Sequence, residues 1–135
     1  MSNARFLGDI ISTDGSIQPL SYAETYVAVT SAANNTTVNC ETGNTFSHTL
    51  TENTTFAFTN PPATGIAYTM SVEIAQDAGA SGFTVAWPTT VKFPAATAPT
   101  LTATAAAIDV FVFTTKDGGT AWYGFTAGQA IATPA

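Results

Sequence analysis

The sequence is divided into short runs in which apolar and polar residues alternate, and Asn, Gly or Pro bounds each run. Alternation with a period of two is typical of a β-strand with one buried face. The clearest run is GIAYTMSVEIAQD, residues 65–77, whose predicted buried face consists of Ile66, Tyr68, Met70, Val72 and Ile74. Weaker runs carry apolar residues at Phe46 and Leu50, at Phe56 and Phe58, and at Phe83, Val85 and Trp87. Apolar residues nowhere recur at helical spacing over a helix length, so the sequence predicts an all-β chain.

Two consecutive segments near the C-terminus predict a hairpin. AIDVFVF, residues 107–113, is apolar on both faces, as expected of a central strand that is buried on both sides or covered by a neighbouring subunit. It leads into KDGGTAWYGF, residues 116–125, where Asp117, Gly118 and Gly119 supply the residues that a tight turn with positive φ requires. We interpret this stretch as a turn followed by a second strand. Whether the side chains that face outward from that strand form a binding site is left undecided at this point.

The length of 135 residues fits one domain with a single core. Residues 1–25 are less regular than the remainder and contain a proline that argues against a central strand. We therefore divide the chain into an N-terminal arm, residues 1–25, and a β-domain, residues 26–135. The arm carries Arg5 and the apolar Phe6, Leu7, Ile10 and Ile11. Such a segment is usually ordered only by a partner, so these residues are predicted to contact another protein or a neighbouring subunit.

The charge of the chain excludes several classes of partner. Three cations and nine acids give a net charge of −6, which leaves no basic stripe to neutralise phosphates, so we expect no nucleic-acid binding. No apolar run approaches the ~20 residues that span a bilayer, so we expect no membrane contact either. The N-terminus lacks the pattern of an export signal, and Cys40 has no partner for a disulfide; both fit synthesis in a cytoplasm.

Only 9% of the residues are charged, and Thr, Ser, Asn and Ala supply the neutral surface. Surfaces with few Lys and Glu side chains lose little rotamer entropy when they are covered. This composition therefore suits a chain that packs against many copies of another protein. The alternative is a host whose amino-acid usage has this bias.

Residues that carry catalysis are scarce. His48 is the single histidine and has the strand parity of Phe46 and Leu50, so a packed side chain is favoured over a general base. No nucleophile motif G-x-S-x-G occurs, and the acids are scattered singly. Asp77, Asp109 and Asp117 are of the residue type that binds hard cations, but turn-capping or solvated carboxylates are favoured. We expect no enzyme activity, no cofactor and no metal site.

Aromatic side chains beside acids can stack a pyranose ring and fix its hydroxyl groups. Trp87, Trp122 and Tyr123 are the candidates, with Asp117 as the neighbouring acid. The favoured alternative is that all three rings pack in the core or at a subunit interface. We keep Trp122, Tyr123 and Asp117 as the glycan platform of this second hypothesis.

Several motifs between Phe56 and Gln129 are similar to a known domain. FTNPPATG, QDAGASGFTVAWP, VKFPAATAPTLT, IDVFVFTTKDGGTAWYGF and AGQA together resemble a β-domain of structural proteins of tailed bacteriophages, such as tail-fibre-like and head-surface proteins of phages of cyanobacteria and other aquatic bacteria. The resemblance covers somewhat more than half of the chain. It implies a virion component with a β-sandwich body, which we expect to be antiparallel and jelly-roll-like.

The chain departs from the fibre forms because it has no long shaft and no baseplate-attachment domain. A sandwich with an N-terminal arm is similar in plan to capsid decoration or cement proteins, which bind over the joints between capsid proteins. The resemblance thus implies a decoration protein on the outer surface of the head, with the major capsid protein as partner. A homo-oligomer is expected, with a trimer favoured. The alternative is a short tail-fibre or adhesin module that binds host surface glycans.

Overall fold

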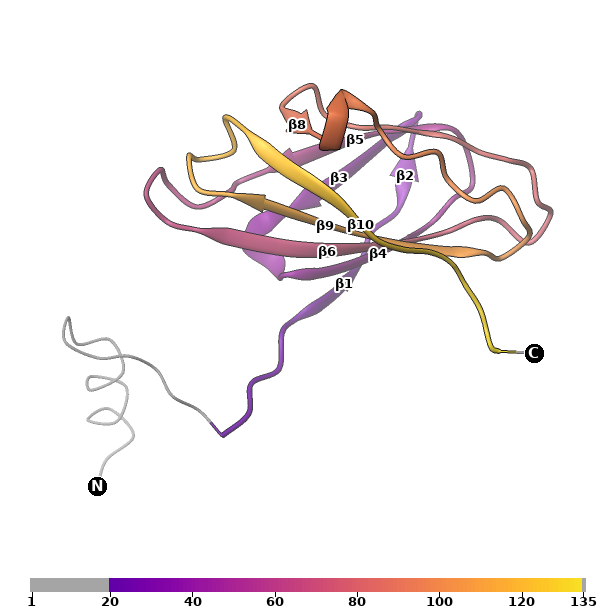
Figure 1. The fold of residues 1–135 in the computed structure, drawn as a ribbon, viewed down its shortest axis with the longest axis horizontal. Helices are drawn as coiled ribbons and strands as arrows, with labels where there is room; N and C mark the ends of the chain where they lie inside the picture. Colours follow the sequence, from indigo (N-terminus) through magenta and orange to yellow (C-terminus); the bar gives the residue numbers. More distant parts are fainter. Residues whose placement is uncertain (1–19, 135) are drawn as a thin grey trace.

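The computed structural model describes residues 20–134, which fold as two β-sheets packed face to face (Figure 1). One sheet has six strands in the order β1-β4-β6-β9-β10-β8, and the other has four in the order β2-β3-β5-β7. The strands are β1 (Tyr26–Ala28), β2 (Ser31–Ala32), β3 (Asn35–Asn39), β4 (Thr45–Thr49), β5 (Thr54–Thr59), β6 (Tyr68–Ala75), β7 (Val85–Ala86), β8 (Val91–Lys92), β9 (Ile108–Thr115) and β10 (Trp122–Ile131). The predicted all-β fold and β-sandwich are confirmed.

Helical structure in the described part is limited to two single turns of 3₁₀ helix, η1 (Cys40–Thr42) and η2 (Pro94–Ala96). Accordingly, residues 20–134 contain no helix with the length and apolar character needed to cross a membrane.

The expectation of antiparallel, jelly-roll-like pairing is wrong for most of the strands. Five of the eight strand pairs are parallel: β1 with β4, β4 with β6, β3 with β5, β5 with β7, and β8 with β10. The cause is the path of the chain, which alternates between the two sheets at every step from β3 to β7. Two strands of one sheet are then separated by one strand of the other, and two reversals of direction restore the original direction.

The core lies between the sheets and consists mainly of the inward side chains of β4, β5, β6 and β9. In β6 the predicted alternation is confirmed, because Tyr68, Met70, Val72 and Ile74 are buried. Ile66 was predicted on the same face, but it precedes the strand and is 55% exposed. A chain of aromatic contacts joins Trp87 to Phe111 and Phe113, whose rings lie 5.2 and 5.0 Å away.

The predicted hairpin is confirmed as the antiparallel pair of β9 and β10. Gly118 and Gly119 both have positive φ, 69° and 80°, in the connecting loop. Strand β9 is interior to its sheet, and Phe111 and Phe113 on its inward face are buried. Its outward face is covered only in part, since Val112 is half-buried within the single chain.

The strands at the edges of both sheets are short. β1 and β8 end the six-stranded sheet, β2 and β7 end the four-stranded sheet, and each has only two or three residues. Short edge strands offer little backbone for pairing with another sheet. Association through long edge-to-edge pairing is therefore disfavoured.

Candidate functional site

The outward side of the six-stranded sheet is the first candidate surface, and we call it the outer face. Strand register aligns its residues in rows, one of which runs from Tyr26 through Thr45, Ser71 and Val112 to Phe125. Over β4 and β6 the face consists of Thr and Ser hydroxyls and Glu73, and over β9 and β10 it is apolar except for Thr114. Its members are Tyr26, Thr45, Ser47, Thr69, Ser71, Glu73, Ile108, Val110, Val112, Thr114, Tyr123, Phe125 and Ile131.

Large apolar side chains are concentrated on the outer face. Seven large hydrophobic residues are exposed in the described part of the chain, and four of them belong to this face: Tyr26, Tyr123, Phe125 and Ile131. Between 45% and 61% of each of these four residues is exposed. Tyr123, Phe125 and Ile131 all lie on β10, next to the apolar outward residues of β9, whereas Tyr26 lies at the far edge on β1. Exposed apolar side chains that gather over two neighbouring strands favour contact with another molecule.

The opposite side of the molecule differs in character. The outward residues of the four-stranded sheet are small or polar and include Asn35, Thr37, Thr55 and Ala57, all of them exposed. None of the seven exposed large hydrophobic residues of the described chain belongs to its strands. The two outward sides of the sandwich are thus chemically unequal, and only one of them has the composition of an interface.

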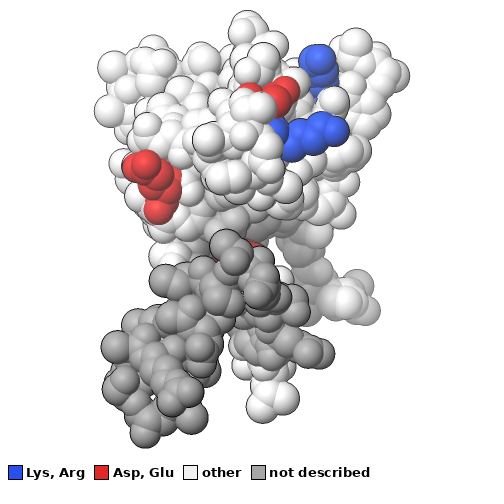
Figure 2. Space-filling model, turned by 90° about the vertical axis from the view of Figure 1, so that its left-hand side faces the viewer, with Lys and Arg blue, Asp and Glu red and all other residues white. Residues whose placement is uncertain are grey.

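Charge is sparse on the outer face. Glu73 is its one acid, and Lys92 of β8 lies beside Tyr123 at its edge. One end of the molecule, shown in Figure 2, carries a few charged side chains in a surface that is otherwise uncharged. Electrostatic steering therefore contributes little here, and shape and apolar area must supply most of the recognition.

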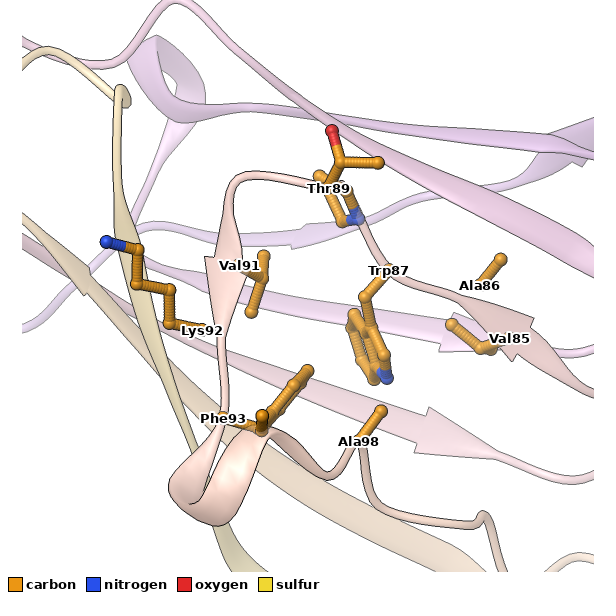
Figure 3. Close-up of a pocket in the computed structure, with 10 residues that line it drawn as sticks. Val85, Ala86, Trp87, Thr89, Val91, Lys92, Phe93 and Ala98 are labelled. Atoms are coloured by element: carbon orange, nitrogen blue, oxygen red, sulfur yellow. The ribbon is translucent and has the colours of Figure 1, made fainter.

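A second candidate is a groove of about 560 Å³ at the edge where the chain passes from β7 to β8; we call it the edge groove. It is lined by Val85, Ala86, Trp87, Pro88, Thr89, Val91, Lys92, Phe93, Ala96 and Ala98. Trp87 is half-buried in its wall, 5.8 Å from the ring of Phe93 and 5.3 Å from that of Phe56. Figure 3 shows Val91, Trp87, Phe93 and Ala98 around the hollow, with the side chain of Lys92 directed away from it.

The residues of the predicted glycan platform are not brought together. Trp122 is 1% exposed and packs edge-on against Phe58, so it cannot stack a ligand. Tyr123 follows it in β10 and therefore points to the opposite side of the sheet, onto the outer face. Asp117 is used locally: its Oδ1 accepts hydrogen bonds from the Ala121 N–H and the Thr115 hydroxyl, both at 3.0 Å. For Trp122, the prediction of a sugar platform is wrong because the ring belongs to the core.

Asp109 differs from the turn-capping or solvated carboxylate that was favoured for it, because it is buried and joins segments that are distant in the sequence. Asp109 is buried, and its Oδ2 accepts from the Thr102 N–H (2.7 Å) and Gln129 Nε2 (3.1 Å). Its Oδ1 accepts from the Thr102 hydroxyl (2.8 Å) and the Ala130 N–H (2.9 Å). Desolvation acts to raise the pKa of Asp109, but these hydrogen bonds outweigh it and lower the pKa.

Asp77 and Asp117, by contrast, cap turns. Desolvation acts to raise the pKa of Asp77, but the hydrogen bonds that its carboxylate accepts from the Ser81 hydroxyl and from the Ser81 and Gly79 N–H groups together lower the pKa. For Asp117 the bond from the Ala121 N–H is the main cause of a lowered pKa. Within residues 20–134 no three His, Cys, Asp or Glu side chains come together as metal ligands.

His48 and Cys40 belong to the core. His48 is 2% exposed, its Nδ1 lies 2.9 Å from the Val29 carbonyl oxygen, and its ring packs edge-on against Phe56. The Nδ1–H therefore donates to that carbonyl, as expected of a packed histidine. Burial raises the pKa of the Cys40 thiol, which keeps it protonated and unreactive at neutral pH.

The predicted contact residues of the arm, Arg5, Phe6, Leu7, Ile10 and Ile11, lie outside the described residues. The sequence interpretation missed the edge groove, although FTVAWP and VKFP, which supply most of its lining, were both noted as motifs. In comparisons with protein-family models, curated proteins and solved structures, the chain matches none of them.

Proposed function

We propose that this chain is a structural protein of a bacteriophage virion, a capsid decoration (cement) protein that binds the outside of the head and stabilises it. The observation that carries the proposal is the inequality of the two sides of the sandwich. A decoration protein needs one side that adheres to the shell and one that faces water. The outer face, with Tyr123, Phe125 and Val112, is suited to adhere to the shell, and the outward side of the four-stranded sheet is suited to face water.

The mechanism is mechanical and needs no cofactor. Burial of apolar area on the assembled shell, at about 25 cal/mol per Å², favours the assembled state over separated capsid proteins. A protein that binds only the assembled state stabilises it by linkage, and the effect is multiplied over every copy. A sheet face that is mainly apolar on one half and mainly hydroxylated on the other suits such a contact, because few charges must be desolvated: Glu73, and Glu24 before β1, whose carboxylate accepts a hydrogen bond from the Thr45 hydroxyl.

The first test compares two matched substitutions on the two sides. Val112→Glu places a charge in the centre of the outer face, and Thr37→Glu places one in the centre of the opposite side. Each variant is mixed with heads that lack this protein, and bound protein is measured after sedimentation. We expect Val112→Glu to lose binding and Thr37→Glu to bind like the parent, with both folded by circular dichroism. Equal binding of the two variants would contradict the proposal.

A second test locates the protein directly. Virions are labelled with a gold-conjugated antibody against this chain and viewed by electron microscopy. Label over the head supports decoration. Label confined to the tail contradicts it and supports the alternative, a short tail-fibre or adhesin module that binds host glycans.

One observation favours that alternative: the half-buried Trp87 lies in the wall of the edge groove. Against it, the groove offers few polar side chains for sugar hydroxyls, with Thr89 as its one side-chain hydroxyl. Under the decoration proposal a glycan array gives no signal. Saturable binding to one glycan that is lost in Trp87→Ala would establish the adhesin instead.

A further inference from the structure

We propose that the edge groove is the receptor for the N-terminal arm of a second copy of this chain, which inserts Phe6, Leu7 and Ile10. This inference does not depend on where the protein resides in a virion. It concerns only how copies of the chain associate.

The groove has the form of a receptor for an extended apolar segment. It lies between β7 and β8, the last strands of the two sheets, so a segment that enters it runs beside strand edges that have a free side. Its lining is mostly apolar, and the half-buried Trp87 joins it to the central aromatic cluster through Phe111 and Phe113. Figure 3 shows the ring of Trp87 between Val91, Phe93 and Ala98, where it forms part of the wall of the groove.

The occupant is indicated by the chain that precedes the described residues. Nineteen residues precede Leu20, and they include the apolar cluster Phe6, Leu7, Ile10 and Ile11. Fully extended they span roughly 60 Å, which is long enough to reach a neighbouring molecule. Lys92 is the one charged residue that lines the groove, and its side chain is directed away from the hollow (Figure 3), so the groove suits an apolar segment.

The path of the chain favours a groove on another copy. Leu20 and Tyr22 are exposed, at 110% and 78%, and β1 ends the six-stranded sheet at the edge opposite to β8. Figure 1 shows residues 20–25 leading away from the domain on the side of β1. The chain thus leaves the domain at the edge of the six-stranded sheet that lies opposite its own groove, which favours the groove of another copy. Because arm and groove are different surfaces, the contact is heterologous, and it forms a closed ring such as a trimer where the rotation between copies allows closure.

The test measures self-association of the full chain by sedimentation velocity over a range of concentrations. Ala98→Glu places a charge in the groove, and Ala57→Glu places one on the exposed side of the four-stranded sheet as a matched control. We expect the parent and Ala57→Glu to form the same oligomer. Ala98→Glu raises the dissociation constant by about tenfold or more, because a buried unpaired charge is costly.

Substitutions in the arm provide a second test, which remains valid if Ala98→Glu disturbs the fold. Phe6→Asp combined with Ile10→Asp alters the arm alone and is expected to dissociate the oligomer to the same extent. Mixing this arm variant with Ala98→Glu restores association, since one partner supplies an intact arm and the other an intact groove. Pull-down of differently tagged chains detects the mixed complex.

Four results overturn the inference. The parent chain is monomeric, which would also be the outcome if the arm occupied its own groove. The oligomer survives the arm substitutions, or it is dissociated by Val112→Glu on the outer face and not by Ala98→Glu. The last result is that the groove variant and the arm variant are each dissociated when measured alone and still fail to associate when they are mixed.

Discussion

Asp109→Asn tests the role of the buried carboxylate that ties two distant segments to β9. Asp109 lies on the inward side of β9 and receives hydrogen bonds from Thr102, in the long connection before the strand, and from Gln129 and Ala130, near the end of β10. Asparagine has nearly the same shape, so the substitution alters charge and hydrogen bonding and leaves packing unchanged. It replaces one acceptor oxygen by an NH₂ group, which can only donate.

The geometry sets the size of the effect. Each carboxylate oxygen accepts one backbone N–H, from Thr102 or from Ala130, so either orientation of the Asn amide leaves one backbone N–H facing another donor. An unsatisfied donor costs about 1–3 kcal/mol, and the retained bonds weaken because the acceptor is no longer charged. Since these bonds are only partly buried, we expect a loss of about 2–3 kcal/mol in the free energy of unfolding, or a Tm lower by roughly 10 °C.

The assay is urea denaturation of parent and Asp109→Asn at several pH values, followed by tryptophan fluorescence. Asp109 has a lowered pKa in the fold, compared with about 3.9 in an unfolded chain, so its contribution is complete above about pH 4 and is lost as the pH falls through the folded-state pKa. The difference in free energy of unfolding between the parent and Asp109→Asn should therefore become smaller as the pH is lowered. Asp77→Asn, at a surface turn, is the control and should cost clearly less. Equal stability at neutral pH, or a gap that does not change in acid, would refute the reasoning.

Three further substitutions or reactions test other parts of the fold. Gly118→Val with Gly119→Val should lower stability by at least about 2 kcal/mol, because both positions have positive φ, and an unchanged Tm would contradict the turn assignment. Gly124→Ala should cost about 1–3 kcal/mol in chemical denaturation, since its Cβ would lie 2.7 Å from the Phe93 ring; no loss would show that the ring moves freely. Cys40 should react with a thiol reagent at neutral pH only after unfolding, and fast labelling of the native protein would contradict its burial.

Side-chain alternation predicted burial well but carried no information about strand partners. The period of two in β6 identifies Met70 and Val72 as inward residues whichever strand lies beside them. Parallel and antiparallel strands share this period, so the alternation between sheets from β3 to β7 left no local signal. The hairpin was predictable because Gly118 and Gly119 signal a turn between adjacent segments, a relation that is local in the sequence.

The candidate surfaces were predictable only in part for the same reason. Trp122 and Tyr123 are adjacent in a strand, so alternation alone requires them to face opposite sides and argues against a shared platform. The edge groove is built by a connection with little regular structure, in which Ala95 and Ala96 adopt positive φ without glycine. No residue pattern predicts such a backbone conformation. The groove can be identified only from the structure, in which the edges of the two sheets lie together.

The two proposed contacts use separate surfaces, and this separation has an energetic consequence. The outer face would hold one copy on the shell, while the arm and the edge groove would link that copy to its neighbours. Linked copies bind as a unit, because dissociation of one leaves it held near its site by the others at a high effective concentration. A weak contact through residues such as Val112 and Phe125 then suffices for stable decoration. A chain with 9% charged residues gains particularly from this arrangement, since it cannot rely on charge pairs to strengthen each single contact.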